Sequence, residues 1–386
     1  MYKKESPVNK ESSAGADNEC FVLSEKSIQS RVLTGVDLFA GAGGFSLAAK
    51  NVGVNVVAAV ELNAKACESY RHNIVKESGP KLYEENLLTL HPGILKENHF
   101  SHGEECDILL GGPPCQGFSV HRIKDAGVDD PRNKLLFRYF EYVQHLRAKI
   151  FLMENVPGLL WPRHKPFLDA LYIQGASAGY TLLPPVVIDA RDYGVPQRRK
   201  RVFVLGVRND IELDIEWPPK RTHSDPSSKL HNPDLLSWLP ASDVFSRPPP
   251  LMDENNRHMN HSQELISVFK QTPINGGSRK DSGRVLPCHG KHDGHTDVYG
   301  RIDPSVPGPT MTTACINPSK GRFVHPIENH GITLRQAARF QTFPDDYVFK
   351  GGLIAAGVQI GNAVPVLLGE VLLKAISESL VRFEGI

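Results

Sequence analysis

Long apolar runs are missing from this 386-residue sequence, and so is any regular spacing of its cysteines. No run approaches the roughly 20 apolar residues that a membrane-spanning helix needs. The polar first 30 residues lack the apolar core of a signal peptide, so we expect a loose tail at residues 1–30. Six irregularly spaced cysteines favour a reduced, cytoplasmic protein over a disulfide framework, nucleoid-associated if the source is prokaryotic.

Net charge is also nearly absent, with 44 Lys and Arg against 43 Asp and Glu. The overall charge therefore gives no indication of a polyanionic partner, and such a site must come from local clustering. One cluster, formed by Arg279, Lys280, Arg284 and Lys291, fits either a solvated loop or a patch that contacts phosphates.

A group of potential metal ligands follows this cluster, but no paired Cys-x-x-Cys accompanies it, and we expect no metal site. Its members are Cys288, His289, His292 and His295.

Short apolar strands alternate with helical patterns in the first half of the chain. An apolar stretch at 32–39 is followed by a Gly-rich turn at 40–44, a helical pattern at 45–52 and a second strand at 54–60 that ends at Glu61. This layout fits either a purely structural turn or a site for a ribose-bearing ligand, in which the acid binds the hydroxyls. Ser46 stands where the third glycine of the dinucleotide motif would fall, so a ligand without a pyrophosphate fits better.

Further strand and helix patterns continue this alternation and predict a doubly wound, mostly parallel α/β sheet of the Rossmann-like kind. They comprise strands at 106–110, 150–153 and 202–206 and helices at 63–73 and 134–146.

Two reactive side chains follow strands of this predicted sheet. Cys115 comes after Gly111–Pro114, a turn that must stop the preceding strand, and Glu154 ends the strand at 150–153. Ligands bind at the carboxyl ends of strands in such sheets, so both can face one cleft. A lone cysteine is more often a small buried hydrophobe, but the Pro-Pro-Cys-Gln setting favours a nucleophile.

A change of composition after residue 207 predicts a second, smaller domain. Residues 208–327 hold 15 of the 29 prolines and lose regular periodicity, so we expect an irregular, loop-rich domain there. Helical patterns return at 333–340 and 366–380. Residues 31–207 and 328–386 are thus expected to form one domain around the inserted one.

The chain resembles the DNA (cytosine-5)-methyltransferases, because six sequence motifs occur in that family's order. They are Asp37–Gly44, Gly112–Gly117, Glu154–Val156, Gln197–Arg201, Arg335–Arg339 with Phe343–Asp345, and Gly361–Pro365. The resemblance implies a catalytic domain that uses S-adenosylmethionine and a target-recognition domain at 208–327. It also implies a restriction-modification context.

The resemblance implies that Cys115 adds to C6 of cytosine and that Glu154 protonates or hydrogen-bonds N3. Arg199 and Arg201 match arginines that line the pocket and bind O2 or position the cysteine and the glutamate. Cysteine suits this chemistry because it is partly ionised and strongly nucleophilic near neutral pH. The target base must be flipped out of the duplex to reach such a cleft.

The cofactor and the DNA would each contact a further set of residues. The cofactor set is Phe39, Gly41, Gly43, Glu61, Asn86, Leu135, Asn362 and Val364, with Asn86 standing where the family usually has an acid. The DNA set is Gln116, Ser119, Arg122, Lys124, Arg279, Lys280 and Arg284.

Other functions remain open at this point. An RNA cytosine-5 methyltransferase shares the fold, but the Cys-Phe-Thr signature of the tRNA-modifying branch is missing here. A non-catalytic relative is disfavoured by the intact Cys115, Glu154 and Arg201. Residues 119–131 fit either a mobile connector or a lid over the flipped base. We expect a monomer on double-stranded DNA, with no membrane contact and no obligatory protein partner.

Overall fold

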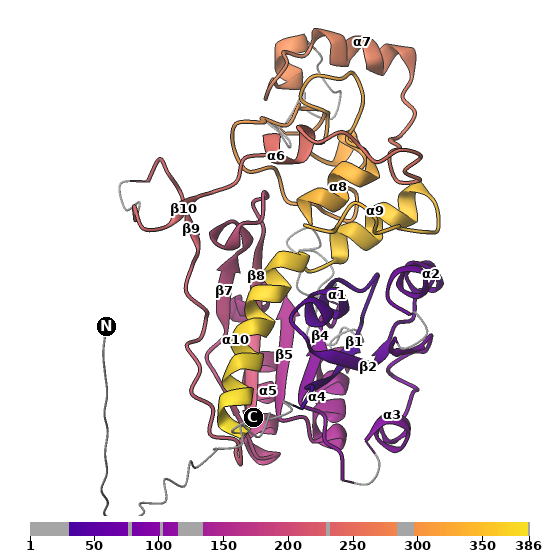
Figure 1. The fold of residues 1–386 in the computed structure, drawn as a ribbon. Helices are drawn as coiled ribbons and strands as arrows, with labels where there is room; N and C mark the ends of the chain where they lie inside the picture. The colour runs from indigo at the N-terminus through magenta and orange to yellow at the C-terminus, as the bar shows by residue number, and fades with distance from the viewer. Residues whose placement is uncertain are drawn as a thin grey trace, which may run out of the picture.

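An eight-stranded sheet forms the centre of the larger part of the molecule in the computed structural model, which describes residues 31–75, 79–100, 103–114, 134–228, 232–283 and 297–384 (Figure 1). Its strand order is β3-β2-β1-β4-β5-β8-β6, and β7 also pairs with β8. The strands are β1 (Thr34–Leu38), β2 (Asn55–Val60), β3 (Lys81–Tyr83), β4 (Ile108–Gly111), β5 (Ile150–Asn155), β6 (Tyr180–Leu182), β7 (Val186–Asp189) and β8 (Lys200–Arg208).

The first five strands are parallel to one another, so the predicted mostly parallel sheet is confirmed. The strand that was expected to continue this run, β8, is instead antiparallel to β5, β6 and β7. A parallel neighbour needs a long crossover connection. The short connection from β7 to β8 runs through the turn at 190–199 and reverses the direction of the chain.

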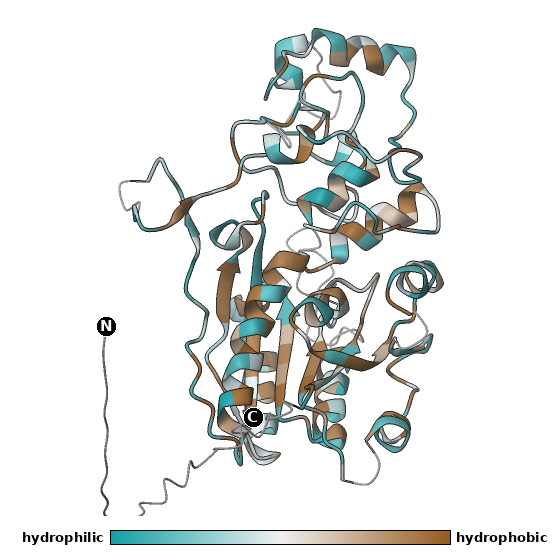
Figure 2. Ribbon diagram, in the orientation of Figure 1, coloured by the Kyte–Doolittle hydropathy of each residue, from teal (hydrophilic) through white to brown (hydrophobic). Residues whose placement is uncertain are grey.

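Helices cover both faces of the sheet, and alternate residues of each strand face opposite sides. Ile108, Leu110, Ile150 and Leu152 pack in one apolar cluster, together with apolar residues of several helices. The intervening residues of β4 and β5 pack in a second cluster with three other helices. Figure 2 shows the central strands as largely hydrophobic, as expected for strands buried on both faces.

The first face is covered by α1 (Gly44–Asn51) and α10 (Val366–Glu384). The second is covered by α3 (Pro92–His99), α4 (Lys134–Leu146) and α5 (Lys165–Ser177). A further helix, α2 (Ala64–Asn73), begins where the Asn63 side chain accepts a hydrogen bond from the Ala66 N–H (3.0 Å). Within the described ranges, no helix is both long and apolar enough to cross a membrane.

The smaller part of the molecule lies beyond the sheet and is drawn at the top of Figure 1. It is loop-rich, as the sequence predicts, but one amphipathic helix was not expected there: α7 (Gln263–Gln271), which buries Phe269. The other elements after β8 are β9 (His223–Ser224), β10 (Leu236–Ser237), α6 (Ser242–Phe245), α8 (Leu334–Phe340) and α9 (Leu353–Asn362).

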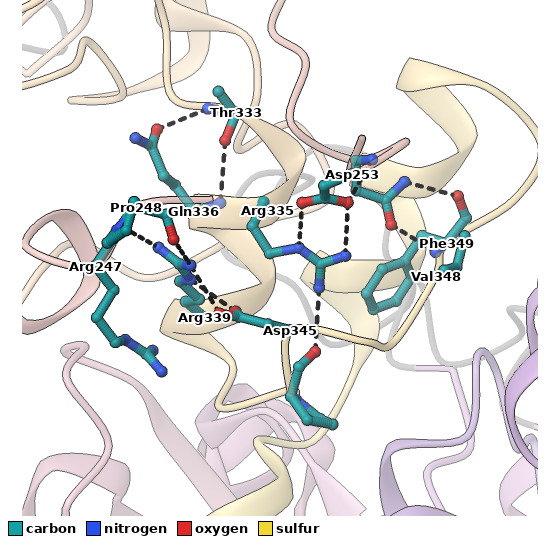
Figure 3. Close-up of polar contacts among 12 residues, drawn as sticks. Arg247, Pro248, Asp253, Thr333, Arg335, Gln336, Arg339, Asp345, Val348 and Phe349 are labelled. Carbon is teal, nitrogen blue, oxygen red and sulfur yellow. Dashed lines mark hydrogen bonds and ion pairs between the residues drawn. The ribbon is translucent and has the colours of Figure 1, made fainter. Parts of the chain in front are cut away.

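Two arginines of α8 hold the preceding chain in place (Figure 3). The Arg335 guanidinium forms a two-bond ion pair with Asp253 (2.7 and 2.9 Å), and both side chains are almost fully buried. Arg339 pairs with Asp345 and also donates to the carbonyls of Arg247 (2.7 Å) and Pro248 (2.9 Å). Residues 247–253 are therefore fixed on α8 by buried, charge-assisted hydrogen bonds.

Candidate active site

One cavity of about 770 Å³ opens at the carboxyl ends of the parallel strands. The strand order reverses between β1 and β4, because the chain passes from β1 to β2 on one side and from β3 to β4 on the other. This is the position at which doubly wound sheets bind ligands. Nine predicted site residues line the cavity: Phe39, Gly41, Glu61, Asn86, Leu135, Glu154, Arg201, Asn362 and Val364.

The turn after β1 forms one wall and has unusual backbone geometry. Phe39 has a φ of 58°, which a bulky side chain adopts only when the surrounding structure holds it there. Gly41 also has a positive φ, and nothing lies within 4 Å of the position that a Cβ would take. The main chain is therefore open for the close approach of a ligand.

Gly43 does not line the cavity, although the sequence suggested that it would bind the cofactor. Its φ is 93°, and a Cβ there would come within 3.1 Å of side-chain atoms of Ile74 and Tyr70 on the far side of the turn. Gly44 lines the cavity instead. The placement of Gly43 supports a role in shaping the turn.

The Glu61 carboxylate lies at the end of β2 and is oriented by two main-chain N–H groups. Its Oε2 accepts from Gly41 (2.8 Å) and its Oε1 from Asn63 (2.7 Å). Each carboxylate oxygen keeps a lone pair for a further donor, such as a ribose hydroxyl. Asn86 lines the same region, and its side-chain oxygen already accepts the Leu88 N–H (3.0 Å), which leaves one acceptor site.

Glu154 and Arg201, which also line the cavity, form an ion pair with 2.8 Å between Glu154 Oε1 and Arg201 Nε. Both side chains are largely buried. Glu154 is the last residue but one of β5 and Arg201 is the second residue of β8, and the antiparallel pairing of these strands brings the two side chains together. A planar guanidinium fixed in this way holds the carboxylate in one orientation.

Arg199 lies behind the cavity and does not line it. Its guanidinium donates to the main-chain carbonyls of Met311 (2.9 Å), Gly361 (3.0 Å) and Ala363 (2.8 Å). Of the two roles suggested for Arg199, its placement supports positioning rather than contact with a base.

Two residues that the sequence did not single out as site residues belong to this site. Asp37 lines the cavity and is 1% exposed, and its carboxylate accepts the Ser46 hydroxyl (2.6 Å). Burial raises the pKa of Asp37 to about 7. Asn155 donates to the Pro113 carbonyl (3.2 Å) and so ties β5 to the turn that leads to Cys115. A polar residue at a strand end was the signal that could have identified Asp37 and Asn155.

Several predicted residues lie outside the part of the chain that the structure describes: Cys115, Gln116, Ser119, Arg122, Lys124 and Arg284, with the proposed lid at 119–131 and the potential metal ligands at 288–295. Among the described residues, no group of His, Cys, Asp or Glu side chains is arranged to hold a metal ion. Arg279 is 3% exposed, so a phosphate cannot reach its guanidinium in this arrangement, whereas Lys280 is exposed.

A doubly wound sheet with an acid after its second strand and a cavity at the switch point defines a nucleotide-binding type of site. Residues 33–378 match the family model of C-5 cytosine-specific DNA methylase, and the chain belongs to this family of DNA (cytosine-5)-methyltransferases. The family and the fold imply a methyl donor.

Relatives with similar sequences are type II methyltransferases. M1.HphI of Haemophilus parahaemolyticus is 32% identical over 365 residues, which cover 92% of this chain and 90% of the relative. M.DdeI of Desulfomicrobium norvegicum is 32% identical over 382 residues, covering 89% and 88%.

Solved structures with the same fold include a DNA modification methyltransferase encoded within an E. coli prophage. It is 26% identical, has a TM-score of 0.67, and is matched over 90% of this chain and 99% of that one. Spodoptera frugiperda DNMT2, at 18% identity and a TM-score of 0.58, covers 89% of this chain and 99% of its own and shares the fold.

Proposed function

We propose that the protein transfers the methyl group of S-adenosylmethionine to C5 of a cytosine flipped out of duplex DNA, through a bond between Cys115 and C6. One observation carries this proposal. A single cavity joins Glu61, the Glu154–Arg201 ion pair and the Pro113–Pro114 turn, which leads directly to Cys115. The acid can hold a nucleoside while the ion pair meets a base a short distance away.

The donor half of the cavity fits S-adenosylmethionine, which supplies an electrophilic methyl group on a sulfonium when it is bound. Glu61 would accept hydrogen bonds from its ribose hydroxyls, and the open main chain at Gly41 would lie against its methionine end. Phe39 and Asn86 would flank the adenine, and the Asn86 side-chain oxygen can accept a hydrogen bond from its amino group. Leu135, Asn362 and Val364 complete this half.

C5 of cytosine is a weak nucleophile, so the base half of the cavity has to activate the ring before C5 can attack the methyl group. Addition of the Cys115 thiolate to C6 places negative charge on the ring, and Glu154 supplies a proton or a hydrogen bond at N3. C5 can then attack the methyl group. Removal of the C5 proton by a base or water allows the thiolate to leave C6, which restores the aromatic ring and the free cysteine.

Arg201 has two roles in this proposal. It holds the Glu154 carboxylate through the 2.8 Å ion pair. Its Nη1 also donates to the Lys200 carbonyl (2.8 Å), and because Arg201 lines the cavity, its other N–H groups would donate to O2 of the base.

Recognition of the DNA sequence is assigned to residues within 208–327, with Lys280 contacting phosphates. The phosphate contacts fix the position on the duplex and carry no sequence information themselves. Gln116, Ser119, Arg122, Lys124 and Arg284 remain proposed DNA contacts on the strength of the resemblance.

The covalent step is tested with DNA in which cytosines are replaced by 5-fluorocytosine. The fluorine cannot be removed as a proton, so the protein and the methylated base should stay joined in a denaturing gel. Cys115→Ser should lose the adduct and keep the fold. Cys106 is a poor substitute because burial raises the pKa of its thiol. An adduct that persists in Cys115→Ser would move the nucleophile to another residue and contradict the proposal.

A further inference from the structure

A buried group of three polar side chains lies behind the cavity, between its donor half and its base half. Gln197, Arg199 and Gln341 are each at most 1% exposed. The Gln197 Nε2 donates to the Phe340 carbonyl (2.6 Å) and to Gln341 Oε1 (2.7 Å), and its Oε1 accepts the Met311 N–H (2.9 Å). We call these three residues the Gln-Arg-Gln bridge.

On the donor side, the bridge holds the segment 360–363. Gln341 Nε2 donates to the carbonyls of Ile360 (2.5 Å) and Ala363 (2.9 Å), and Arg199 donates to those of Gly361 and Ala363. Residues 361–364 form a wall of the cavity. Both side chains therefore meet at the Ala363 carbonyl, directly behind the wall that faces the donor.

On the base side, the main chain at the start of β8 connects the bridge to the Glu154–Arg201 ion pair. Arg199 precedes Arg201 by two residues, and its carbonyl accepts the Ala190 N–H (2.8 Å), which fixes the start of β8. Arg201 then holds Glu154. Buried amides whose donors are all used allow little displacement, because a displaced N–H or carbonyl would lose its partner away from water.

We propose that Gln197, Arg199 and Gln341 are positioning residues that set the distance between the wall of the donor half and the Glu154–Arg201 pair. This inference rests on the proposed function. Transfer of a methyl group requires near-contact alignment of the two reacting atoms, and a misplacement of about 1 Å can cost on the order of a hundredfold in rate. Binding within either half alone does not require that alignment.

The test uses Gln341→Glu, which keeps the size of the side chain but turns an oxygen toward the carbonyls of Ile360 and Ala363. Gln341→Met is a second variant, which removes the same hydrogen bonds without adding charge. If one of the two variants fails to fold, the other still tests the inference. The matched control is Asn73→Asp. The Asn73 amide also donates to two carbonyls, those of Ser69 (2.7 Å) and Val348 (2.8 Å), but it does not line the cavity.

Three quantities are measured on the full chain. Calorimetry gives the affinity for S-adenosylhomocysteine. Tritium release from unmethylated plasmid DNA carrying [5-³H]cytosine, without donor, reports reversible addition of the thiolate to C6 with exchange of the C5 hydrogen for one from water. Single-turnover transfer from labelled S-adenosylmethionine to the same plasmid reports methyl transfer, which needs both halves of the cavity together.

For the Gln341 variants, we expect affinity and exchange to stay within about threefold, while methyl transfer falls by roughly thirty- to a hundredfold. In Asn73→Asp, all three quantities should stay within about threefold although the Tm falls. Parallel loss of exchange and transfer, or an affinity loss as large as the transfer loss, would reduce the bridge to a structural element and overturn the inference. A wild-type protein that shows neither exchange nor transfer would overturn the proposed function itself.

Discussion

At the scale of single residues, Glu61 provides a direct test of the donor half of the cavity. Glu61→Ala removes hydrogen bonds to the ribose hydroxyls, and each charge-assisted bond of this kind contributes roughly 1.5–3 kcal/mol. We expect S-adenosylmethionine binding, measured by calorimetry, to weaken by about ten- to a hundredfold or more. Plasmid binding should change little.

Glu84→Ala serves as the control for this experiment, since Glu84 pairs with Arg71 on the surface and does not line the cavity. It should leave donor affinity unchanged. If Glu61→Ala weakened donor and DNA binding equally, the placement of the ribose would be incorrect. Binding of NAD(P) in the same assay would support the oxidoreductase function that a Gly-rich turn alone permits.

Asp37 gives a prediction about pH. Its carboxyl group is buried, and burial raises its pKa from 3.8 to about 7. Between these values, the unfolded chain loses this proton while the folded chain keeps it, so the free energy of unfolding falls as the pH rises toward 7. Its contribution is on the order of 4 kcal/mol at most.

Asp37→Asn should therefore make the free energy of unfolding less dependent on pH between about 4 and 7. Urea unfolding of both proteins without ligand, at several pH values in this range, measures the difference. If the two pH profiles ran parallel, Asp37 would be ionised in the folded protein, contrary to this account.

At the scale of elements, a group of four histidines joins the loop before α7 to the loop before α8. We call His258, His261, His325 and His330 the histidine cluster. The rings of His258 and His330 are parallel, with centroids 3.9 Å apart, and the ring of His325 lies 5.5 Å from that of His330. Two such rings cannot both be protonated without strong repulsion.

The charges around this cluster also disfavour protonation. Burial, the neighbouring histidines and Arg301 lower the pKa of His325 to about 4, and burial also lowers the pKa of His261 and His330, with Glu328 acting in the opposite sense on His330. Below pH 6.5, the ordinary pKa of histidine, these side chains bind more protons in the unfolded chain than in the folded one. Stability is therefore lost as the pH falls from 6.5 toward 4.

We expect the hydrogen-exchange protection of α7 and of residues 325–332 to fall between about pH 6.5 and 4, while β1 to β5 stay protected. His330→Gln should reduce this change, because it removes one partner of the stacked pair. His145→Gln, on the exposed face of α4, should not. A uniform loss of protection over the whole molecule would show that the histidine cluster is not the cause.

Local sequence pattern was enough to predict the elements that carry the cavity. The apolar runs at 32–39, 54–60 and 150–153 form strands, and the acids that follow two of these runs, Glu61 and Glu154, line one cavity. This works because parallel strands separated by helices can be arranged in few ways.

Features made by pairing distant segments could not be predicted in this way. The antiparallel direction of β8 depends on a turn whose geometry the apolar pattern does not encode. The Arg335–Asp253 pair joins residues 82 positions apart. Gly43 lies in a Gly-rich turn typical of ligand-binding sites, yet in the structure it faces Ile74 and Tyr70 and does not line the cavity.

At the scale of the whole molecule, both ends of the proposed recognition region, 208–327, pack on the catalytic core. Ile211 is buried in the same apolar cluster as α10, and the Ser379 hydroxyl of α10 donates to the Asp214 carbonyl (2.5 Å). Near the other end, Met311 bonds to Gln197 and Arg199 of the Gln-Arg-Gln bridge. The part that can be exchanged without disturbing catalysis is therefore narrower than the change of composition suggests.

Two chimeras with a type II relative separate these parts. Exchange of 258–303 keeps the Arg335–Asp253 pair, the Met311 contacts and the α10 contacts, so it should transfer the sequence specificity of the relative with unchanged S-adenosylhomocysteine affinity. Exchange of 208–327 replaces both packed ends and should lower the Tm and weaken that affinity. Methylated-DNA sequencing identifies the modified site. An active 258–303 chimera that still methylates the original sequence would show that specificity resides elsewhere in the chain.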